Sequence, residues 1–339
     1  MIRLLVVDDS AVMRQAMIAI GRSAGDIEVT VAADPLIAQS KIEREPFDVV
    51  LLDVEMPRMD GLTYLRKLMS ERPLPVIVCS ALAGRGTEVA IRALEEGAVD
   101  IVEKPRVSLH EFLAESNVCL LDAIRGAASA RLRRRARQSI AAPPLPVTVR
   151  GTGTKVVAIG ASTGGTEALR EILEAMPPDA PGMLIVQHMP ELFTAAFARR
   201  LNETCRIQVK EAADGDRIIA GRALIAPGNR HALVRRDGAQ YRVQLSDGPL
   251  VSRHRPSVDV LFQSAAQAAG PNAVGVILTG MGNDGAAGML EMHRGGAVTI
   301  AQDESTSVVF GMPGAAIAKG SVRFVHPLPA IAPAILSFA

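Results

Sequence analysis

VVAIGASTGG, from Val156 to Gly165, is a run of apolar residues that ends in a serine and two glycines. The valines and the isoleucine are typical of a buried strand, and the glycines that follow are typical of a tight turn. Two other apolar runs end in a similar way: LIVQH (184–188) in a histidine, and VILTGMGNDG (276–285) in a loop with an aspartate. Because ligands and catalytic groups collect at the carboxyl ends of parallel strands, we expect this serine, histidine and aspartate to lie together.

The composition fits two globular domains. A chain of 339 residues with 48% hydrophobic and 22% charged residues can bury two cores, and a net charge of +1 argues against a protein that coats nucleic acid. The three cysteines, Cys79, Cys119 and Cys205, are widely spaced and form no CxxC pair. We therefore predict neither a disulfide framework nor a zinc site, and expect each cysteine to be a small apolar core residue.

The sequence contains no obvious membrane or export segment. The apolar run at 2–7 is too short for a signal peptide and is followed by two acids. No stretch approaches the roughly 20 apolar residues that a membrane span requires. We expect a soluble, cytoplasmic protein.

The first part of the chain alternates short apolar runs with amphipathic stretches. The runs lie at 2–7, 29–31, 49–52, 76–78 and 100–102. Five such strands separated by helices predict an α/β domain with a doubly wound, five-stranded parallel sheet. We assign residues 1–128 to this domain and expect its last helix at about 109–128.

Residues 129–153 are expected to be a linker because they contain an arginine cluster (131–137) followed by prolines. The arginines could contact nucleic acid or a membrane, but a short run without interleaved aromatics favours a solvated helix end or hinge.

Residues 154–339 are expected to form a second, Rossmann-like α/β domain with a doubly wound, mostly parallel sheet. Asp237 and Gly238 supply a tight hairpin turn between two of its strands. Helices are expected after Ser162, after Pro190 and after Pro256, the last with Ser257 near its start. The predicted strands are 156–160, 183–187, 207–210, 223–226, 232–235, 241–245, 274–279, 297–301 and 322–325.

Five polar residues follow strands of the first domain and can converge on one pocket: Asp8, Asp9, Asp53, Ser80 and Lys104. Clustered carboxylates repel one another, and a hard cation such as Mg²⁺ relieves that repulsion. The same cation lets a carboxylate attack a phosphoryl donor, while a lysine can hold a phosphoryl oxygen. Alternatively, the first two aspartates cap a helix and the third is a loop acid, but five matching positions make this the weaker interpretation.

These residues resemble a response-regulator receiver domain. The resemblance rests on LLDVEMPRMDG (51–61), the two N-terminal aspartates, Ser80-Ala81 and Lys104-Pro105. It implies a flavodoxin-like fold with Asp53 as the phosphoacceptor and a histidine kinase as the phosphodonor.

The resemblance also implies the ligands of the receiver's Mg²⁺: Asp9, Asp53 and the carbonyl of Glu55, with Asp8 acting through water. Ser80 and Lys104 would bind the phosphoryl group. Many receivers carry an aromatic switch residue three positions before the lysine, where this chain has Ile101. An aromatic-rotamer switch is therefore not predicted.

A serine becomes a nucleophile only when a base takes its proton and a third group orients that base. Ser162 lies in a Gly-x-Ser-x-Gly string that matches the nucleophile elbow of α/β-hydrolases, yet the chain order of Ser162, His188 and Asp284 differs from theirs. Taken singly, the serine could cap a helix, the histidine could be an ordinary loop residue and the aspartate could belong to a turn. Their joint placement favours catalysis. The other histidines, at 110, 231, 254, 293 and 326, are expected to be ordinary.

Four strings then indicate a family: IGASTGGTEA from Ile159, QHMP from Gln187, RPSVD from Arg255 and TGMGNDGA from Thr279. They resemble the chemotaxis methylesterase family, and with the receiver the resemblance covers all but the linker. It implies Ser162 as nucleophile, His188 as general base and then acid, and Asp284 as the group that orients His188. Thr163 would help to position the site, and the backbone N–H of Met281 would contribute to an oxyanion hole.

The implied substrates are glutamate methyl esters on chemoreceptors, and the family also deamidates glutamines. Mg²⁺ is expected to serve only the receiver, with no cofactor for hydrolysis. The expected partners are the receptors and the histidine kinase, with no nucleic acid and with the membrane reached only through receptors. We also expect the unphosphorylated receiver to cover the face that carries Ser162, and phosphorylation to open it.

Two other classes of protein fit the sequence less well. A DNA-binding regulator is disfavoured because the second half lacks a helix-turn-helix pattern. A non-catalytic adaptor is disfavoured because the serine, the histidine and the aspartate are all present.

Overall fold

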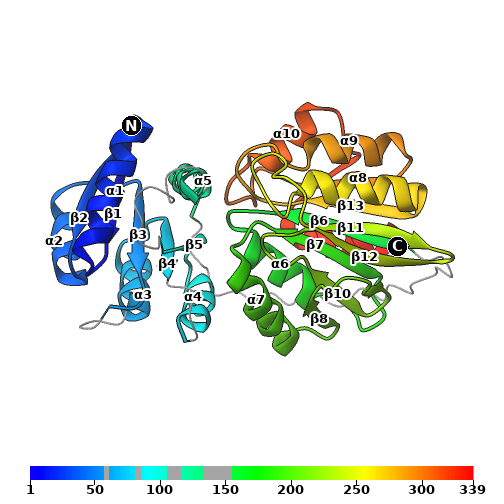
Figure 1. Ribbon diagram of the computed structural model, residues 1–339, viewed down its shortest axis with the longest axis horizontal. Coiled ribbons are helices and arrows are strands. Elements are labelled where there is room, and N and C mark those ends of the chain that lie inside the picture. Colours follow the sequence, from blue (N-terminus) through cyan, green and yellow to red (C-terminus); the bar gives the residue numbers. More distant parts are fainter. Residues whose placement is uncertain (57–60, 81–84, 105–115, 133–154, 339) are drawn as a thin grey trace. The chain divides into compact units, whose positions relative to one another are not determined.

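The computed structural model describes residues 1–56, 61–80, 85–104, 116–132 and 155–338 (Figure 1). The chain divides into two compact units, Met1–Leu132 and Arg133–Ala339. From residue 133 onward the expected linker and its arginines lie outside the described residues. The boundaries 1–128, 129–153 and 154–339 therefore stay predictions.

The first unit alternates strands and helices along the chain. Its elements are β1 (Ile2–Val7), α1 (Ala11–Ala24), β2 (Ile27–Ala32), α2 (Pro35–Arg44), β3 (Val49–Asp53), α3 (Gly61–Glu71), β4 (Val76–Ser80), α4 (Arg85–Glu95), β5 (Asp100–Glu103) and α5 (Ser116–Ala128). Residues 109–115 of the last expected helix lie outside the described residues. The strands form one parallel sheet in the order β2-β1-β3-β4-β5, which confirms the flavodoxin-like fold.

Local sequence accounts for these elements. Every residue of β3 and β4 is buried, as expected for central strands covered on both faces. The Ser10 hydroxyl accepts a hydrogen bond from the Met13 N–H and caps α1, while Gly25, at φ +75°, ends this helix in the left-handed region. An added Cβ on Gly61 would lie 2.5 Å from the Asp53 carbonyl oxygen, so the start of α3 packs very close to the end of β3.

The second unit is larger. Its elements are β6 (Val156–Ala161), α6 (Gly165–Glu174), β7 (Gly182–Gln187), α7 (Glu191–Thr204), β8 (Gln208–Glu211), β9 (Arg217–Ile218), β10 (Arg222–Ile225), β11 (His231–Asp237), β12 (Gln240–Ser246), α8 (Val258–Ala269), η1 (Gly270–Asn272), β13 (Ala273–Ile277), α9 (Ala286–Arg294), β14 (Val298–Gln302), α10 (Met312–Ala318), β15 (Phe324–His326) and α11 (Leu328–Phe338). The sequence patterns had identified all of its strands except the two-residue β9.

Seven of these strands form one parallel sheet in the order β15-β14-β13-β6-β7-β10-β8. Helices α8, α9 and α10 pack together, and α6, α7 and α11 form a second packed group (Figure 1). The predicted hairpin is present with its turn at Gly238 (φ +60°), but it belongs to a separate antiparallel sheet, β11-β12-β9. The main sheet is therefore wholly parallel, as a doubly wound fold with helical crossovers allows.

Strand β6 lies at the centre of this sheet, hydrogen-bonded to β13 on one side and β7 on the other. The chain leaves β6, β7 and β13 at the same edge, where the strand order reverses. Such a switch point is where doubly wound sheets bind ligands.

The cysteines only partly meet expectation. Cys79 is buried in β4, and burial raises the pKa of its thiol. Cys205 is partly buried and Cys119 is exposed, so the prediction that all three are core residues is wrong. The buried face of α5 is made by Leu120, Ile124 and Ala127, and Cys119 precedes that stripe.

In the described ranges, no helix combines the length and the hydrophobicity that a membrane crossing requires.

Candidate active site

Ser162 is the first residue after β6 and is buried. Its N–H donates to the Thr279 carbonyl (3.0 Å), and its own carbonyl accepts a hydrogen bond from Gln187 Nε2 (2.9 Å). Helix α6 is capped by Gly164 without a side-chain hydrogen bond, so Ser162 is not a helix cap. Gly164 has φ +75°, and an added Cβ there would lie 2.6 Å from the Val308 side chain. The serine is thus held on a tight strand-to-helix turn that only glycine can complete.

His188 leaves the neighbouring strand at the same level. Its N–H donates to the Ala161 carbonyl (3.0 Å), directly before Ser162. Its ring donates through Nε2–H to Asp284 Oδ2 (2.9 Å), the direction that a carboxylate acceptor requires. Its other nitrogen, Nδ1, is buried and has no hydrogen-bond partner among the residues that the structure describes. Nδ1 is therefore the nitrogen left to take a proton.

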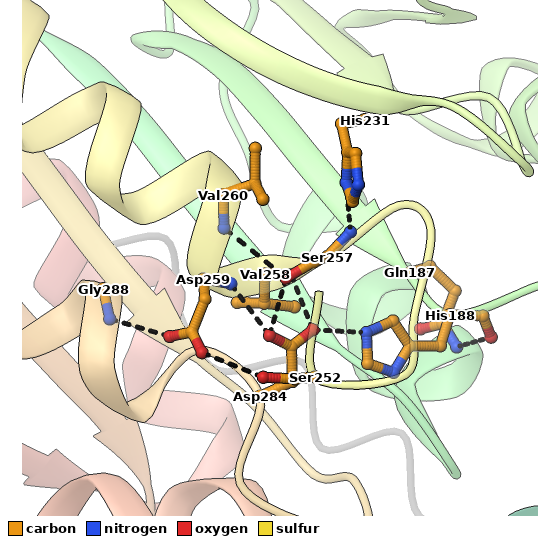
Figure 2. Close-up of polar contacts among 10 residues, drawn as sticks. All are labelled: Gln187, His188, His231, Ser252, Ser257, Val258, Asp259, Val260, Asp284 and Gly288. Carbon is orange, nitrogen blue, oxygen red and sulfur yellow. Dashed lines mark hydrogen bonds and ion pairs between the residues drawn. The ribbon is translucent and has the colours of Figure 1, made fainter. Parts of the chain in front are cut away.

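Asp284 is surrounded by donors at the start of α8 (Figure 2). Its Oδ1 accepts from Ser257 Oγ (2.8 Å) and the Asp259 N–H (3.0 Å), and its Oδ2 accepts from the Val258 N–H (2.7 Å) and His188. Burial acts to raise the pKa of Asp284, but His188 and the two backbone N–H groups outweigh it and lower the pKa to about 2. A helix N-terminus stabilises negative charge in this way, so Asp284 stays ionised and is more than a turn residue.

The two remaining predicted residues flank the serine. Thr163 is buried, and its carbonyl accepts from the Thr279 hydroxyl (3.0 Å). Gly280 approaches Ser162 so closely that an added Cβ would lie 2.7 Å from the serine Cβ. The next N–H, that of Met281, makes no hydrogen bond to any residue in the described ranges. Since the N–H of Ser162 is engaged by Thr279, Met281 offers a donor beside the nucleophile.

The acidic pocket of the first unit brings its predicted residues together as well. One carboxylate oxygen each from Asp8, Asp9 and Asp53 lie within 4.8 Å of one another. Asp8 and Asp53 are buried and Asp9 is exposed. Lys104 Nζ pairs with Asp53 Oδ2 (2.7 Å) and Asp8 Oδ2 (2.9 Å).

Ser80 and Glu55 border the same pocket. Ser80 is buried at the end of β4, and its carbonyl accepts the Lys104 N–H (2.8 Å). The Glu55 N–H donates to Asp53 Oδ1 (2.9 Å), which holds the Glu55 backbone beside the carboxylate. Residues 57–60, Ala81 and Pro105, which contribute to the receiver resemblance, lie outside the described residues.

The charges of this pocket fit a divalent cation. Burial, reinforced by the charge of Asp53, raises the pKa of Asp8 against the opposing effect of Lys104. Burial alone would lower the pKa of Lys104, but its bonds to Asp53 and Asp8 raise it. A single ammonium thus faces three carboxylates whose oxygens lie close enough to share one ion, the donor set that Mg²⁺ prefers.

Two protein families match this chain. The family described as CheB methylesterase matches residues 157–335, and the response regulator receiver domain family matches residues 4–114. The chain belongs to the CheB methylesterase family. The resemblance drawn from the sequence motifs is confirmed.

Two relatives match along nearly the whole of this chain. Protein-glutamate methylesterase/protein-glutamine glutaminase 5 of Anaeromyxobacter dehalogenans (strain 2CP-C) is 59% identical over 347 residues, covering 99% of this chain and 96% of the relative. The corresponding protein 3 of Geobacter metallireducens (strain ATCC 53774 / DSM 7210 / GS-15) is 57% identical over 349 residues, covering 99% and 98%. The crystal structure of the Thermotoga maritima CheB methylesterase catalytic domain matches with a TM-score of 0.54 and 36% identity, covering 56% of this chain and 100% of that one.

Two residues of the candidate site were not predicted from the sequence. Ser257 was expected only near a helix start, yet it both caps α8 and donates to Asp284. The RPSVD string contains Ser257, but nothing in the string indicates the hydrogen bond to Asp284. His254 was expected to be ordinary, but its ring stacks on His188. No local pattern pairs these two histidines, because they are brought together only by the fold.

Proposed function

We propose that this chain hydrolyses glutamate methyl esters on chemoreceptors and the side-chain amide of specific glutamines. The names of its relatives, protein-glutamate methylesterase/protein-glutamine glutaminase, support both activities. The observation that carries the mechanism is the hydrogen bonding of His188. Its Nε2 is bound to an ionised Asp284, and its Nδ1 has no hydrogen-bond partner in the part of the chain that the structure describes. His188 directly follows β7, the strand that pairs with β6 just before Ser162.

In the first half of the reaction, Ser162 Oγ attacks the ester carbonyl and its proton passes to His188 Nδ1. The negative charge that develops on the carbonyl oxygen is stabilised by the Met281 N–H, with Thr163 holding the turn. Removing one such donor costs about 3–4 kcal/mol of transition-state stabilisation in a serine protease. Asp284 stabilises the imidazolium and keeps its Nε2–H oriented.

In the second half, His188 returns the proton to the leaving oxygen and methanol departs. A water molecule, deprotonated by Nδ1, then attacks the acyl-serine and releases the glutamate carboxylate and the Ser162 hydroxyl. With a glutamine substrate the leaving group is ammonia and the remaining steps are unchanged. Both substrates need only water as co-reactant.

The first unit supplies control. Asp53 receives a phosphoryl group from a histidine kinase, and Lys104 and Ser80 hold its oxygens. Asp9, Asp53 and the Glu55 carbonyl would ligate Mg²⁺, with Asp8 acting through water. A bound Mg²⁺ supplies charge neutralisation for phosphoryl transfer. Phosphorylation of Asp53 raises the esterase activity of the second unit by shifting the population towards its active form. With chemoreceptors and a histidine kinase as partners, we infer that the reaction takes place in the cytoplasm.

Methanol release from receptor membranes carrying methylated glutamates tests this proposal. Wild type should release methanol, and Ser162→Ala should be slower by about a thousandfold or more, because the nucleophile is lost. Ser337→Ala, at an exposed serine of α11, is the matched control and should equal wild type. An adaptor without catalysis would release no methanol in any form, and a Ser162→Ala protein as fast as wild type would exclude the assigned nucleophile.

A further inference from the structure

His254 lies flat against the catalytic-site histidine. The ring centroids of His254 and His188 are 3.8 Å apart, and the two planes differ by 11°. The Asp284 carboxylate binds one edge of the His188 ring at Nε2, whereas His254 covers a face. Two residues therefore contact the His188 ring: Asp284 binds its Nε2 at the edge, and His254 packs on one face.

The backbone that carries His254 is held in an unfavourable conformation. Val251 and His254 exchange two backbone hydrogen bonds (3.1 and 2.9 Å) around a two-residue turn. The central residues Ser252 and Arg253 both have positive φ, 50° and 68°, a region where glycine, asparagine and aspartate are the usual residues. Strain of this kind concentrates at functional sites, where the surrounding structure enforces it.

Contacts with the site hold the turn in place. Ser252 Oγ donates to Asp259 Oδ2 (3.3 Å), and the Asp259 N–H in turn binds Asp284 (3.0 Å). Just after the turn, the Arg255 guanidinium donates to Asn229 Oδ1 (2.6 Å) and the Gly248 carbonyl (2.9 Å). The position of the His254 ring is thus tied to the same helix start that holds Asp284.

His254 is uncharged at neutral pH. Burial, then the charges of His188 and Arg253, lower its pKa to about 3 against the opposing effect of Asp284. A neutral ring can stack on His188 throughout the reaction, whereas a second cation would oppose the imidazolium that forms there.

We propose that His254 is a positioning residue whose neutral ring fixes the plane of His188, so that Nδ1 points at Ser162 while Nε2 stays on Asp284. A single hydrogen bond at Nε2 leaves the imidazole free to pivot about that bond. The stacked ring removes this freedom, which supplies the orientation that general-base catalysis requires. The inference rests on the proposed function of Ser162, His188 and Asp284.

Paired variants of the full-length protein separate stacking from other roles. In methanol release, His254→Ala should lower kcat by about tenfold with KM within about twofold, since small misplacements of a catalytic group cost this much or more. His254→Phe keeps a flat ring and should stay within about threefold of wild type. His293→Ala, at an exposed histidine of α9, is the matched control. Should His254→Ala fail to fold, His254→Asn makes the same comparison.

A second readout reports the His188 ring itself. In ¹⁵N NMR spectra of wild type, His188 should be a single Nε2–H tautomer. In the folded His254→Ala protein the two ring nitrogens should move towards averaged shifts, and His254→Phe should restore the wild-type pattern. A merely space-filling ring would leave this signature unchanged.

The inference is overturned if His254→Ala has wild-type kcat, or if His254→Phe is as slow as His254→Ala while both are folded. Ser162→Ala, measured in parallel, distinguishes a failure of the proposed mechanism from a failure of the positioning role of His254. An active Ser162→Ala protein would remove the proposed mechanism, whereas an inactive one beside a fully active His254→Ala protein would remove only the positioning role.

Discussion

The two sites of this protein use buried aspartates in opposite ways. Asp8 in the first unit and Asp284 in the second both follow buried strands of parallel sheets and are both almost fully buried. Burial is the largest influence on the pKa of each and acts to raise it. The outcome differs, because the pKa of Asp8 is raised and that of Asp284 is lowered to about 2.

The difference comes from the donors around each carboxylate. Asp284 receives four hydrogen bonds, two of them from backbone N–H groups at the start of α8. Asp8 accepts one backbone hydrogen bond, from the Ser10 N–H (2.8 Å), shares one lysine with Asp53 and faces the charges of two other carboxylates. A saturated carboxylate can orient a neighbour but has no capacity left for a new ligand. The carboxylates of the acidic pocket have fewer hydrogen-bond donors, so their oxygens keep lone pairs that can bind a cation and, at Asp53, attack a phosphoryl group.

Asp284→Asn removes the charge of the carboxylate that has the most hydrogen-bond donors, and it should have the largest effect on methanol release. An amide can present its N–H to His188 Nε2 and so favour the wrong tautomer, with the proton on Nδ1. In a serine protease the same exchange costs about 10⁴-fold in kcat. We expect a loss of about 10³-fold or more in methanol release, with KM little changed.

Asp237→Asn, at the exposed end of the β11–β12 hairpin, provides the matched control and should equal wild type. An Asp284→Asn protein that keeps more than about a tenth of the wild-type rate would mean that His188 does not depend on this acceptor.

Ser257→Ala removes one of the four hydrogen-bond donors around Asp284 and should have a smaller effect on activity than Asp284→Asn. The variant loses the 2.8 Å hydrogen bond to Asp284 and the side-chain cap of α8. We expect kcat to fall by about tenfold and the free energy of unfolding to fall by about 1 kcal/mol, the typical contribution of a cap. Enzyme assays and urea titrations measure the two quantities on the same sample. If activity were unchanged while stability fell, Ser257 would serve the helix alone.

Much of this architecture could be predicted from local sequence. Apolar runs predicted the strands of the two parallel sheets, and the Asp237-Gly238 pair predicted the hairpin, because these signals act between near neighbours in the chain. The convergence of Ser162, His188 and Asp284 also followed from one rule, that the carboxyl ends of parallel strands meet at one edge. Strand β9, with two residues, is too short to produce any pattern.

The contacts that complete the site could not be predicted in this way. His254 reaches His188 through a turn in which Ser252 and Arg253 adopt positive φ, against the preference of both residue types. That conformation is set by tertiary contacts such as the one between Ser252 and Asp259. The exposure of Cys119 likewise depends on which face of α5 packs on the sheet.

The most direct test of the link between the two sites is the initial rate of methanol release with and without a phosphodonor and Mg²⁺, for wild type and Asp53→Asn. We expect the phosphodonor to raise the wild-type rate severalfold or more. Asp53→Asn should stay at the unstimulated rate in both conditions, because its triad is intact and only the acceptor oxygen is lost. Equal stimulation of wild type and Asp53→Asn would contradict control of Ser162 through the acidic pocket.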